Sequence, residues 1–149
     1  GVSKGGAAAG QFCVNDTRCK AGINLTGFMY GDIVNIDLQV PFFFINEEEL
    51  WCPDCYPNDL FFKRAGSDAY QMKIRGARHT NFGDYPLYGW FIQSSGDKPT
   101  IDGQRVIQIL NVYSLTFFDK HLKGTTSTLL DGPSADFSEV VFMSNHAVP

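Results

Sequence analysis

Short apolar runs separated by polar, glycine-containing segments recur along the chain. Three of them, at 21–26, 42–45 and 69–74, predict buried β-strands, and the third shows the alternation of a strand. The second run, Phe42–Ile45, has four consecutive apolar side chains, which is typical of a parallel strand covered on both faces. The chain therefore has the pattern of a sheet buried between layers.

Longer segments between and after these runs predict helices. Residues 5–14 are rich in Ala and Gly, which favours a short helix in close contact with a flat surface. Residues 102–122 form the longest helix candidate, with an apolar side and with Gly124 just past its end. A short helical segment is expected at 60–65, and the chain after residue 122 is expected to be a tail with one apolar patch at 140–143.

The alternation of strands and helices predicts an α/β fold, with a parallel sheet flanked by helices. Three strands are few for a sheet covered on both faces. The chain also opens on Gly1 in the middle of a motif. We therefore expect residues 1–149 to be a partial domain whose first strands are absent.

Composition narrows the range of functions. The 149 residues are 44% hydrophobic and 19% charged, which suits a chain that buries a core. A net charge of −4 argues against a nucleic-acid partner, which requires clustered Lys and Arg. No apolar run reaches the roughly 18 residues that a membrane helix needs.

The first residues fit the pattern G-x-S-x-G. In such an elbow, Ser3 sits on a sharp strand-to-helix turn that raises its hydroxyl above the sheet. Small residues at Gly1 and Gly5 let the backbone turn and the next helix approach. The backbone N–H of Lys4 would then face the oxyanion of a tetrahedral intermediate. Five residues match by chance in a glycine-rich chain, so the alternative is a plain turn.

His79 is the candidate general base. It follows the last predicted strand after a short glycine-containing loop, and a serine that precedes the histidine in the chain is the order found in α/β-hydrolases. His121, at the end of the long helix, and His146, in the tail, are weaker candidates.

Several segments together resemble a known family. They are GVSKGGA at 1–7, RCKAGINL at 18–25, PFFFIN at 41–46, IRGARHTNFGD at 74–84 and SLTFFDKHL at 114–122. The chain resembles the α/β-hydrolase lipases of the plasma-type platelet-activating-factor acetylhydrolase group, with the cutinases as more distant relatives. The resemblance implies a serine ester hydrolase of the lipase type with an ester or lipid substrate, no cofactor and no metal. It allows peripheral contact with a lipid surface and leaves the oligomeric state open.

The triad acid departs from the family pattern. The resemblance places it after the strand that follows the elbow helix, where this chain has Thr26. In the cutinase-like relatives a threonine stands there and the acid follows the next strand, which favours Glu48 or Glu49 here, although three successive glutamates also suit a solvated loop. Asp32 is a second candidate, and impaired catalysis is a third outcome.

The four cysteines, at 13, 19, 52 and 55, allow three pairings. With the sequons at Asn15 and Asn24, they favour a secreted protein, although Asn24 falls in a buried run. The segment WCPDC at 51–55 is similar to thioredoxin-type redox sites, but Pro57 would fall inside the helix that such a site needs. A structural bridge or free thiols are favoured there over redox or zinc chemistry.

Two other functional classes stay open. Thr26 is compatible with a catalytically impaired pseudo-hydrolase or a binding protein. A fragment without independent function is the other alternative, because a sheet that lacks strands exposes an unpaired edge.

Overall fold

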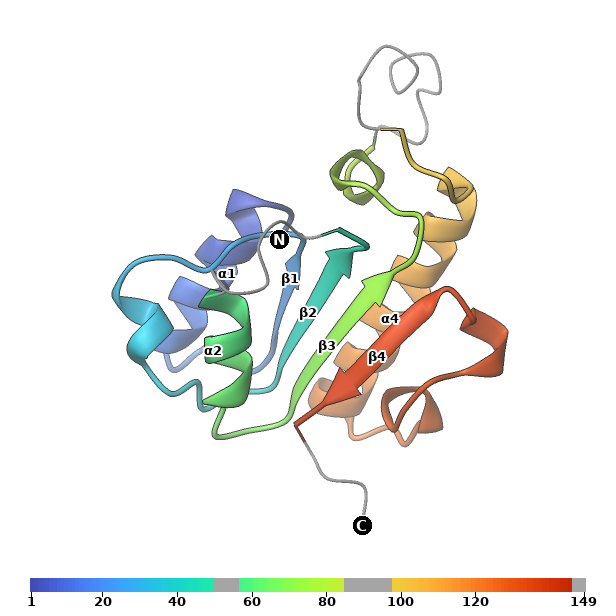
Figure 1. Cartoon of the computed structure of the whole chain (residues 1–149). Helices are drawn as coiled ribbons and strands as arrows, with labels where there is room; N and C mark the ends of the chain where they lie inside the picture. Colours follow the sequence, from blue (N-terminus) through green and yellow to red (C-terminus); the bar gives the residue numbers. More distant parts are fainter. Residues whose placement is uncertain (50–56, 85–97, 146–149) are drawn as a thin grey trace.

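The computed structural model describes residues 1–49, 57–84 and 98–145, and these form a sheet with helices on both faces (Figure 1). The sheet has the order β1-β2-β3-β4. Its strands are β1 (Gly22–Leu25), β2 (Phe42–Glu47), β3 (Ala69–Ile74) and β4 (Val140–Ser144). The helices are α1 (Lys4–Asn15), α2 (Pro57–Lys63) and α4 (Gly103–Lys123), and the 3-10 turns are η1 (Asp32–Asn35), η3 (His79–Phe82), η5 (Thr128–Leu130) and η6 (Ala135–Phe137).

The three strands expected from the sequence are neighbours in the sheet and run parallel. Ile23 pairs with Phe43, and Phe43 pairs with Tyr70, so the pairs stack across the sheet in one register. Parallel strands end on the same side, and the segments that follow β1, β2 and β3 therefore meet at one edge. The prediction of a parallel α/β sheet is confirmed.

The expectation of a plain tail after the long helix is wrong. The apolar patch at its end forms β4, which pairs antiparallel with β3 through Ile74 and Val140. Val140 and Phe142 are buried while Val141 and Met143 are exposed. This alternation of buried and exposed side chains is that of a strand with one solvated face.

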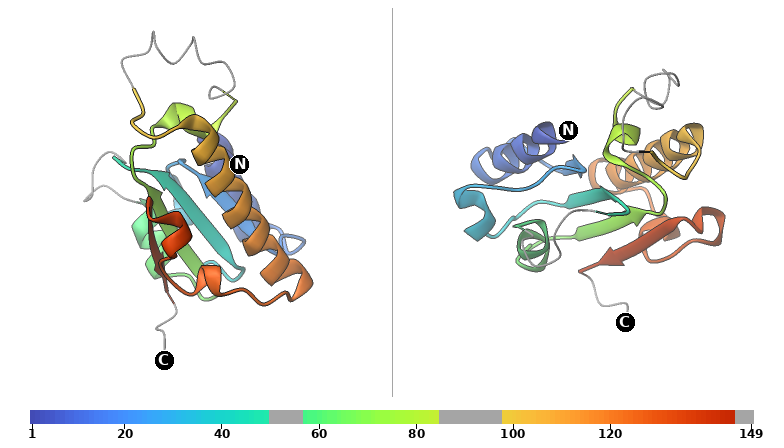
Figure 2. Two further views of the ribbon diagram at one scale, coloured as in Figure 1. Left: turned by 90° about the vertical axis from the view of Figure 1, so that its right-hand side faces the viewer. Right: turned by 45° about the horizontal axis from the view of Figure 1, so that its top comes forward.

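The apolar side chains of the sheet divide between two cores. Phe43 and Ile45 pack on the side of α4, whereas Phe42 and Phe44 pack on the side of α1 and α2. Figure 2 shows α4 crossing one face of the sheet while α1 and α2 cover the other. Side chains along β2 thus alternate between two apolar layers, which explains why its first four residues, Phe42–Ile45, are all apolar.

The first three residues of the chain continue the sheet beyond β1. Val2 forms a parallel bridge with Leu25. The Ser3 N–H donates to Leu25 O over 2.8 Å, and the Leu25 N–H donates to Gly1 O over 2.9 Å. The turn into α1 therefore starts from strand geometry, which the sequence pattern at Ser3 requires.

A disulfide joins Cys13, near the end of α1, to Cys19, just before β1. The sequence left this pairing open. Cys52 and Cys55 lie outside the described residues, so the expectation that they are not a redox centre stays a prediction. Asn24 is fully buried, in agreement with the low weight given to its sequon, whereas Asn15 is exposed.

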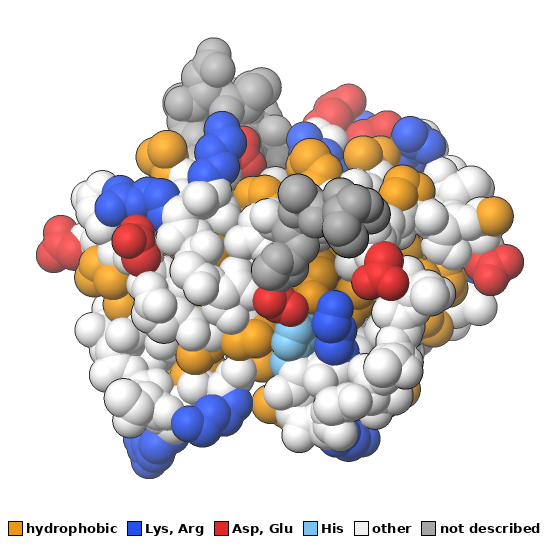
Figure 3. Space-filling model, turned by 90° about the horizontal axis from the view of Figure 1, so that it is seen from below, with side chains coloured by type: hydrophobic (Ala, Val, Ile, Leu, Met, Phe, Trp, Pro, Cys, Tyr) orange, Lys and Arg blue, Asp and Glu red, His pale blue; other side chains and the backbone are white. Residues whose placement is uncertain are grey.

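The surface carries charges of both signs. On the face seen in Figure 3, acidic and basic side chains are interspersed with hydrophobic ones. No helix within the described ranges is long and apolar enough to cross a membrane.

We expect the ion pair between Arg105 of α4 and Glu139 to stabilise the fold in a pH-dependent way. Arg105 Nε lies 2.8 Å from Glu139 Oε1, and this hydrogen bond lowers the pKa of Glu139 below its ordinary value. A carboxyl whose pKa is depressed by folding stabilises the protein above its unfolded-state pKa, and that stability is lost as the pH falls through the folded-state pKa.

Glu139→Gln should therefore lower the urea midpoint slightly at neutral pH, and the difference from wild type should shrink below about pH 4. Paired urea titrations at several pH values measure this. An equal difference at neutral and acidic pH would contradict the assignment.

Candidate active site

Ser3 occupies a sharp turn between the strand-like segment and α1. Its backbone has φ 53° and ψ −122°, a region that non-glycine residues rarely adopt. Such a conformation costs on the order of 1–3 kcal/mol and persists only where its surroundings fix it. Strand hydrogen bonds on one side and α1 on the other supply that fixation, so the local geometry matches a nucleophile elbow.

Close backbone approach at this turn depends on Gly1 and Gly6. A Cβ atom at Gly1 would overlap the backbone of Gly5, and one at Gly6 would overlap the side chain of Asn24. A Cβ at Gly5 would meet nothing within 4 Å. The pattern assigned the small second position to Gly5, whereas the packing requires it at Gly6.

Lys4 is the first residue of α1, and its side chain is exposed. The N–H groups of a first helical turn have no carbonyl partner within the helix, and the helix dipole places partial positive charge there. The Lys4 N–H thus lies beside Ser3 at the end of a helix that favours negative charge.

The turn after β1 adjoins Ser3. A Cβ at Gly27 would overlap the carbonyl oxygen of Ser3, so the two backbones touch. The buried Asn24 side chain closes this turn, because its Oδ1 accepts from Gly27 N over 2.8 Å and its Nδ2 donates to Gly27 O over 2.9 Å. Asn58 of α2 also donates to Gly27 O over 2.7 Å.

Thr26, in the same turn, contacts His79. Its hydroxyl donates to Glu47 Oε1 over 2.9 Å and lies 3.3 Å from His79 Nδ1. Glu47 Oε1 itself lies 3.4 Å from His79 Nδ1. Thr26, Glu47 and His79 follow or end three successive parallel strands, so the carboxyl edge of the sheet gathers one hydroxyl, one carboxylate and one imidazole beside the Ser3 turn.

Glu48 and Glu49, the preferred acids from the sequence, lie elsewhere. Glu48 Oε2 accepts from the Gly76 N–H over 2.9 Å, and Arg78 Nη2 lies 3.6 Å from Glu49 Oε2. The physical reason is that β2 continues to Glu47, so that Glu47 is oriented by the pleat of the strand, whereas the next two residues form a turn. Both carboxylates brace the loop that carries His79 rather than its ring.

The other candidates from the sequence take structural positions. Asp32 begins η1, which packs against α1 and α2. The ring of His121 packs 4.8 Å from the ring of Phe117, within the aromatic core. His146 lies outside the described residues.

The apolar run ends the second predicted strand at Ile45, which favours Glu48 or Glu49 over Glu47 among the three glutamates. One signal was present in the sequence. Continuing the two-residue period from Phe43 and Ile45 puts Glu47 on the same face, toward α4. No comparable signal in the sequence indicated that the Thr26 hydroxyl contacts both Glu47 and His79.

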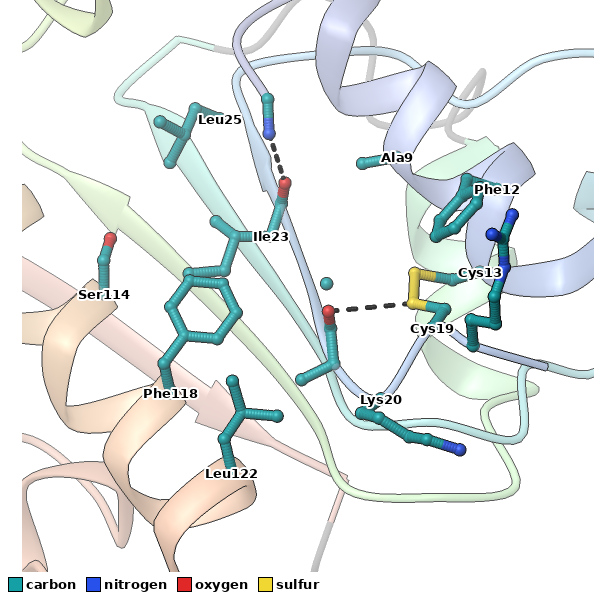
Figure 4. A pocket seen from close by; sticks show the side chains of 14 residues that line it. Ala9, Phe12, Cys13, Cys19, Lys20, Ile23, Leu25, Ser114, Phe118 and Leu122 are labelled. Atoms are coloured by element: carbon teal, nitrogen blue, oxygen red, sulfur yellow. Dashed lines mark hydrogen bonds between the residues drawn. A yellow bond between two sulfur atoms is a disulfide. The ribbon is translucent and has the colours of Figure 1, made fainter. Parts of the chain in front are cut away.

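A cavity of about 610 Å³ lies away from this cluster, along the edge of β1 between α1 and α4. Figure 4 shows Phe12 and the Cys13–Cys19 disulfide on one side of it and Phe118 and Leu122 on the other. Of the residues around the cluster, Gly1 and Leu25 line it, but Thr26, Glu47 and His79 do not. It is an apolar groove on the sheet edge, separate from the polar cluster.

Comparison with known proteins identifies the family of the chain. Residues 1–129 match the family described as platelet-activating factor acetylhydrolase, isoform II. The chain belongs to this family. The bovine platelet-activating factor acetylhydrolase is 33% identical over 82% of the chain. A probable 1-alkyl-2-acetylglycerophosphocholine esterase from Arthroderma benhamiae is 30% identical over 96% of the chain.

The acetylhydrolase-family chain has the α/β-hydrolase fold. It superposes on a ferulic acid esterase from Streptomyces cinnamoneus with a TM-score of 0.80 and 27% identity, over 96% of this chain and 45% of the esterase. It spans 28% of the bovine relative and 42% of the fungal one. Within the described residues, no cluster of three or more His, Cys, Asp or Glu side chains suits a metal ion.

We expect Gly6→Ala and Gly5→Ala to have different effects on the stability of the protein. Gly6→Ala should lower the free energy of unfolding by about 1–3 kcal/mol, because its Cβ displaces Asn24. Gly5→Ala should leave stability unchanged or raise it by up to about 1 kcal/mol, because alanine favours the helix and meets no neighbour.

Urea denaturation of the protein expressed from its full open reading frame measures both effects. Equal destabilisation by the two substitutions would contradict the packing described for the elbow.

Proposed function

We propose that the protein is a serine-dependent carboxylic ester hydrolase with Ser3 as nucleophile, His79 as general base and Glu47 as the acid that orients His79. The observation that carries this proposal is the 3.4 Å approach of His79 Nδ1 to Glu47 Oε1. Both groups contact Thr26, and the next residue of that turn, Gly27, lies against the backbone of Ser3. A carboxylate on Nδ1 keeps that nitrogen protonated and leaves Nε2 free to accept a proton.

In the proposed reaction, Ser3 Oγ bonds to the ester carbonyl carbon as its proton passes to His79 Nε2. The Lys4 N–H donates to the developing oxyanion, supported by the positive end of α1. His79 then gives the proton to the leaving alcohol. Water, activated by the same imidazole, releases the acid from Ser3. Each half of the reaction combines nucleophilic attack, cleavage of a C–O bond and proton transfer through His79, so the proposal includes no cofactor or metal.

The names of the relatives support the substrate class that we propose. One is an acetylhydrolase of platelet-activating factor and another a probable esterase of a 1-alkyl-2-acetylglycerophosphocholine. We therefore propose a short acyl ester, such as the acetyl ester of a phospholipid, as substrate, with lipase-like contact to a lipid surface. The structural neighbour makes a feruloyl ester the natural comparison substrate.

We also propose that the protein is secreted. The Cys13–Cys19 disulfide and the exposed Asn15 sequon support an oxidising compartment.

Ser3→Ala should abolish both labelling by a fluorophosphonate probe and hydrolysis of p-nitrophenyl acetate, because both need an activated serine. Mass spectrometry of the labelled wild type should locate the adduct on the peptide that contains Ser3. Hydrolysis that persists in Ser3→Ala, or a wild-type protein that takes no label, would favour the non-catalytic alternative.

Glu47→Gln should lower kcat by up to about 10⁴-fold, because the amide cannot stabilise the imidazolium. Glu49→Gln is the matched control and should stay within about threefold of wild type, because the exposed Glu49 contacts Arg78 and not the ring. Initial-rate kinetics with p-nitrophenyl acetate compare the two.

The carboxylate that orients His79 can also be placed at position 26 instead of position 47. Thr26→Asp in the Glu47→Gln background should restore part of the lost kcat, because residue 26 lies 3.3 Å from Nδ1. In the wild-type background, two adjacent carboxylates would repel each other, and Thr26→Asp should give no gain. Full activity in Glu47→Gln alone would overturn the assignment of the acid.

A further inference from the structure

The Thr26 hydroxyl stands between the two groups on which the proposed reaction depends. It donates to Glu47 Oε1 over 2.9 Å and lies 3.3 Å from His79 Nδ1. A hydroxyl has one proton and two lone pairs. Because the proton is directed to Glu47, the contact with His79 requires Nδ1 to be the donor. Thr26 thus favours the tautomer with a free Nε2.

The backbone supports a specific role for this side chain. Thr26 has φ 50°, which is an outlier for a β-branched residue. It is also buried, with 1% of its surface exposed, and its N–H donates to Ile45 O over 2.8 Å. The Asn24 clasp on Gly27 holds the same turn closed. A strained position that several contacts fix is typical of residues whose direction matters to a site.

We infer that Thr26 is a positioning residue of the hydrolase, an inference that rests on the proposed function. Its hydroxyl holds the Glu47 carboxylate beside His79 and provides a second acceptor for the Nδ1 proton. Glu47 Oε1 lies 3.4 Å from Nδ1, longer than the 2.7–2.9 Å of a strong charge-assisted bond. The imidazolium formed during reaction would then be stabilised by two acceptors instead of one long contact.

The role follows from the place of Thr26 in the chain. It stands where the resemblance expects the acid, and Glu47 reaches the same ring from the neighbouring strand. Thr26 therefore contacts His79 through its hydroxyl while Glu47 carries the negative charge.

Thr26→Val tests the hydroxyl alone, because valine keeps the shape and the β-branch. We expect kcat to fall by about 10- to 100-fold while KM stays within about twofold. The reason is that the hydrogen bond from His79 Nδ1 to the Thr26 hydroxyl strengthens in the transition state, when the imidazole is charged. Thr26→Ser, which keeps the hydroxyl, should stay within about threefold of wild type. Circular dichroism and thermal unfolding of both variants check the fold.

A second pair keeps the test decisive if Thr26→Val does not fold. Thr26→Ser and Thr26→Ala both remove the methyl group, and only the alanine removes the hydroxyl. The inference requires Thr26→Ala to be at least about tenfold slower in kcat than Thr26→Ser. Equal rates in this pair, or a Thr26→Val enzyme as fast as wild type, would overturn it.

Two further variants separate this inference from the proposed function. If Thr26 acts through Glu47 and His79, adding Thr26→Val to the Glu47→Gln enzyme should lower kcat by a far smaller factor than adding it to the wild type. Multiplicative effects of the two substitutions would contradict the inference alone. A Ser3→Ala protein that still hydrolyses the ester would instead contradict the proposed function, whatever the Thr26 variants do.

Discussion

The hydrogen bond from the Thr26 N–H to the Ile45 carbonyl fixes how the ends of β1 and β2 meet. Leu25 pairs with Ile45, so Thr26 and Glu47 leave the sheet side by side. A shift of one residue in β2 would turn Glu47 toward α1 and α2 and bring an amide or a turn residue to the ring. The identity of the carboxylate at His79 is thus decided by strand register more than by the residue types nearby.

The same edge of the sheet shows how three successive glutamates take different positions. Glu47 is the last residue of β2 and faces His79. Glu48 accepts from the Gly76 N–H, and its own N–H lies 3.3 Å from Ala77 O. Glu49 faces Arg78. Together these contacts tie the turn after β2 to the loop after β3, which carries the imidazole.

Sequence patterns predicted the parts of the fold that depend on local periodicity. The three parallel strands and the helices α1 and α4 follow from apolar spacing, and the Ser3 elbow from its small residues. β4 was missed because one short apolar patch after a long polar stretch has no local partner, and its pairing with β3 is decided by tertiary contacts.

In the candidate site, too, some features are indicated by the sequence and others depend on tertiary structure. Ser3 and His79 are proposed from motif and strand order, and in the structure the Thr26–Gly27 turn contacts both of them. The carboxylate depends on where β2 ends, and strand ends are uncertain by a few residues when only the sequence is considered. The Thr26 contact depends on a positive φ that no residue type signals, since threonine rarely adopts it. The site's fine geometry therefore required the structure.

The most direct test is a crystal structure of the protein, expressed from its full open reading frame, after reaction with a fluorophosphonate. We expect phosphorus bonded to Ser3 Oγ, with Nε2 of His79 facing the adduct. Nδ1 of His79 should lie within hydrogen-bond distance of both Glu47 and Thr26. Phosphorus on another residue, or another carboxylate on Nδ1, would contradict it.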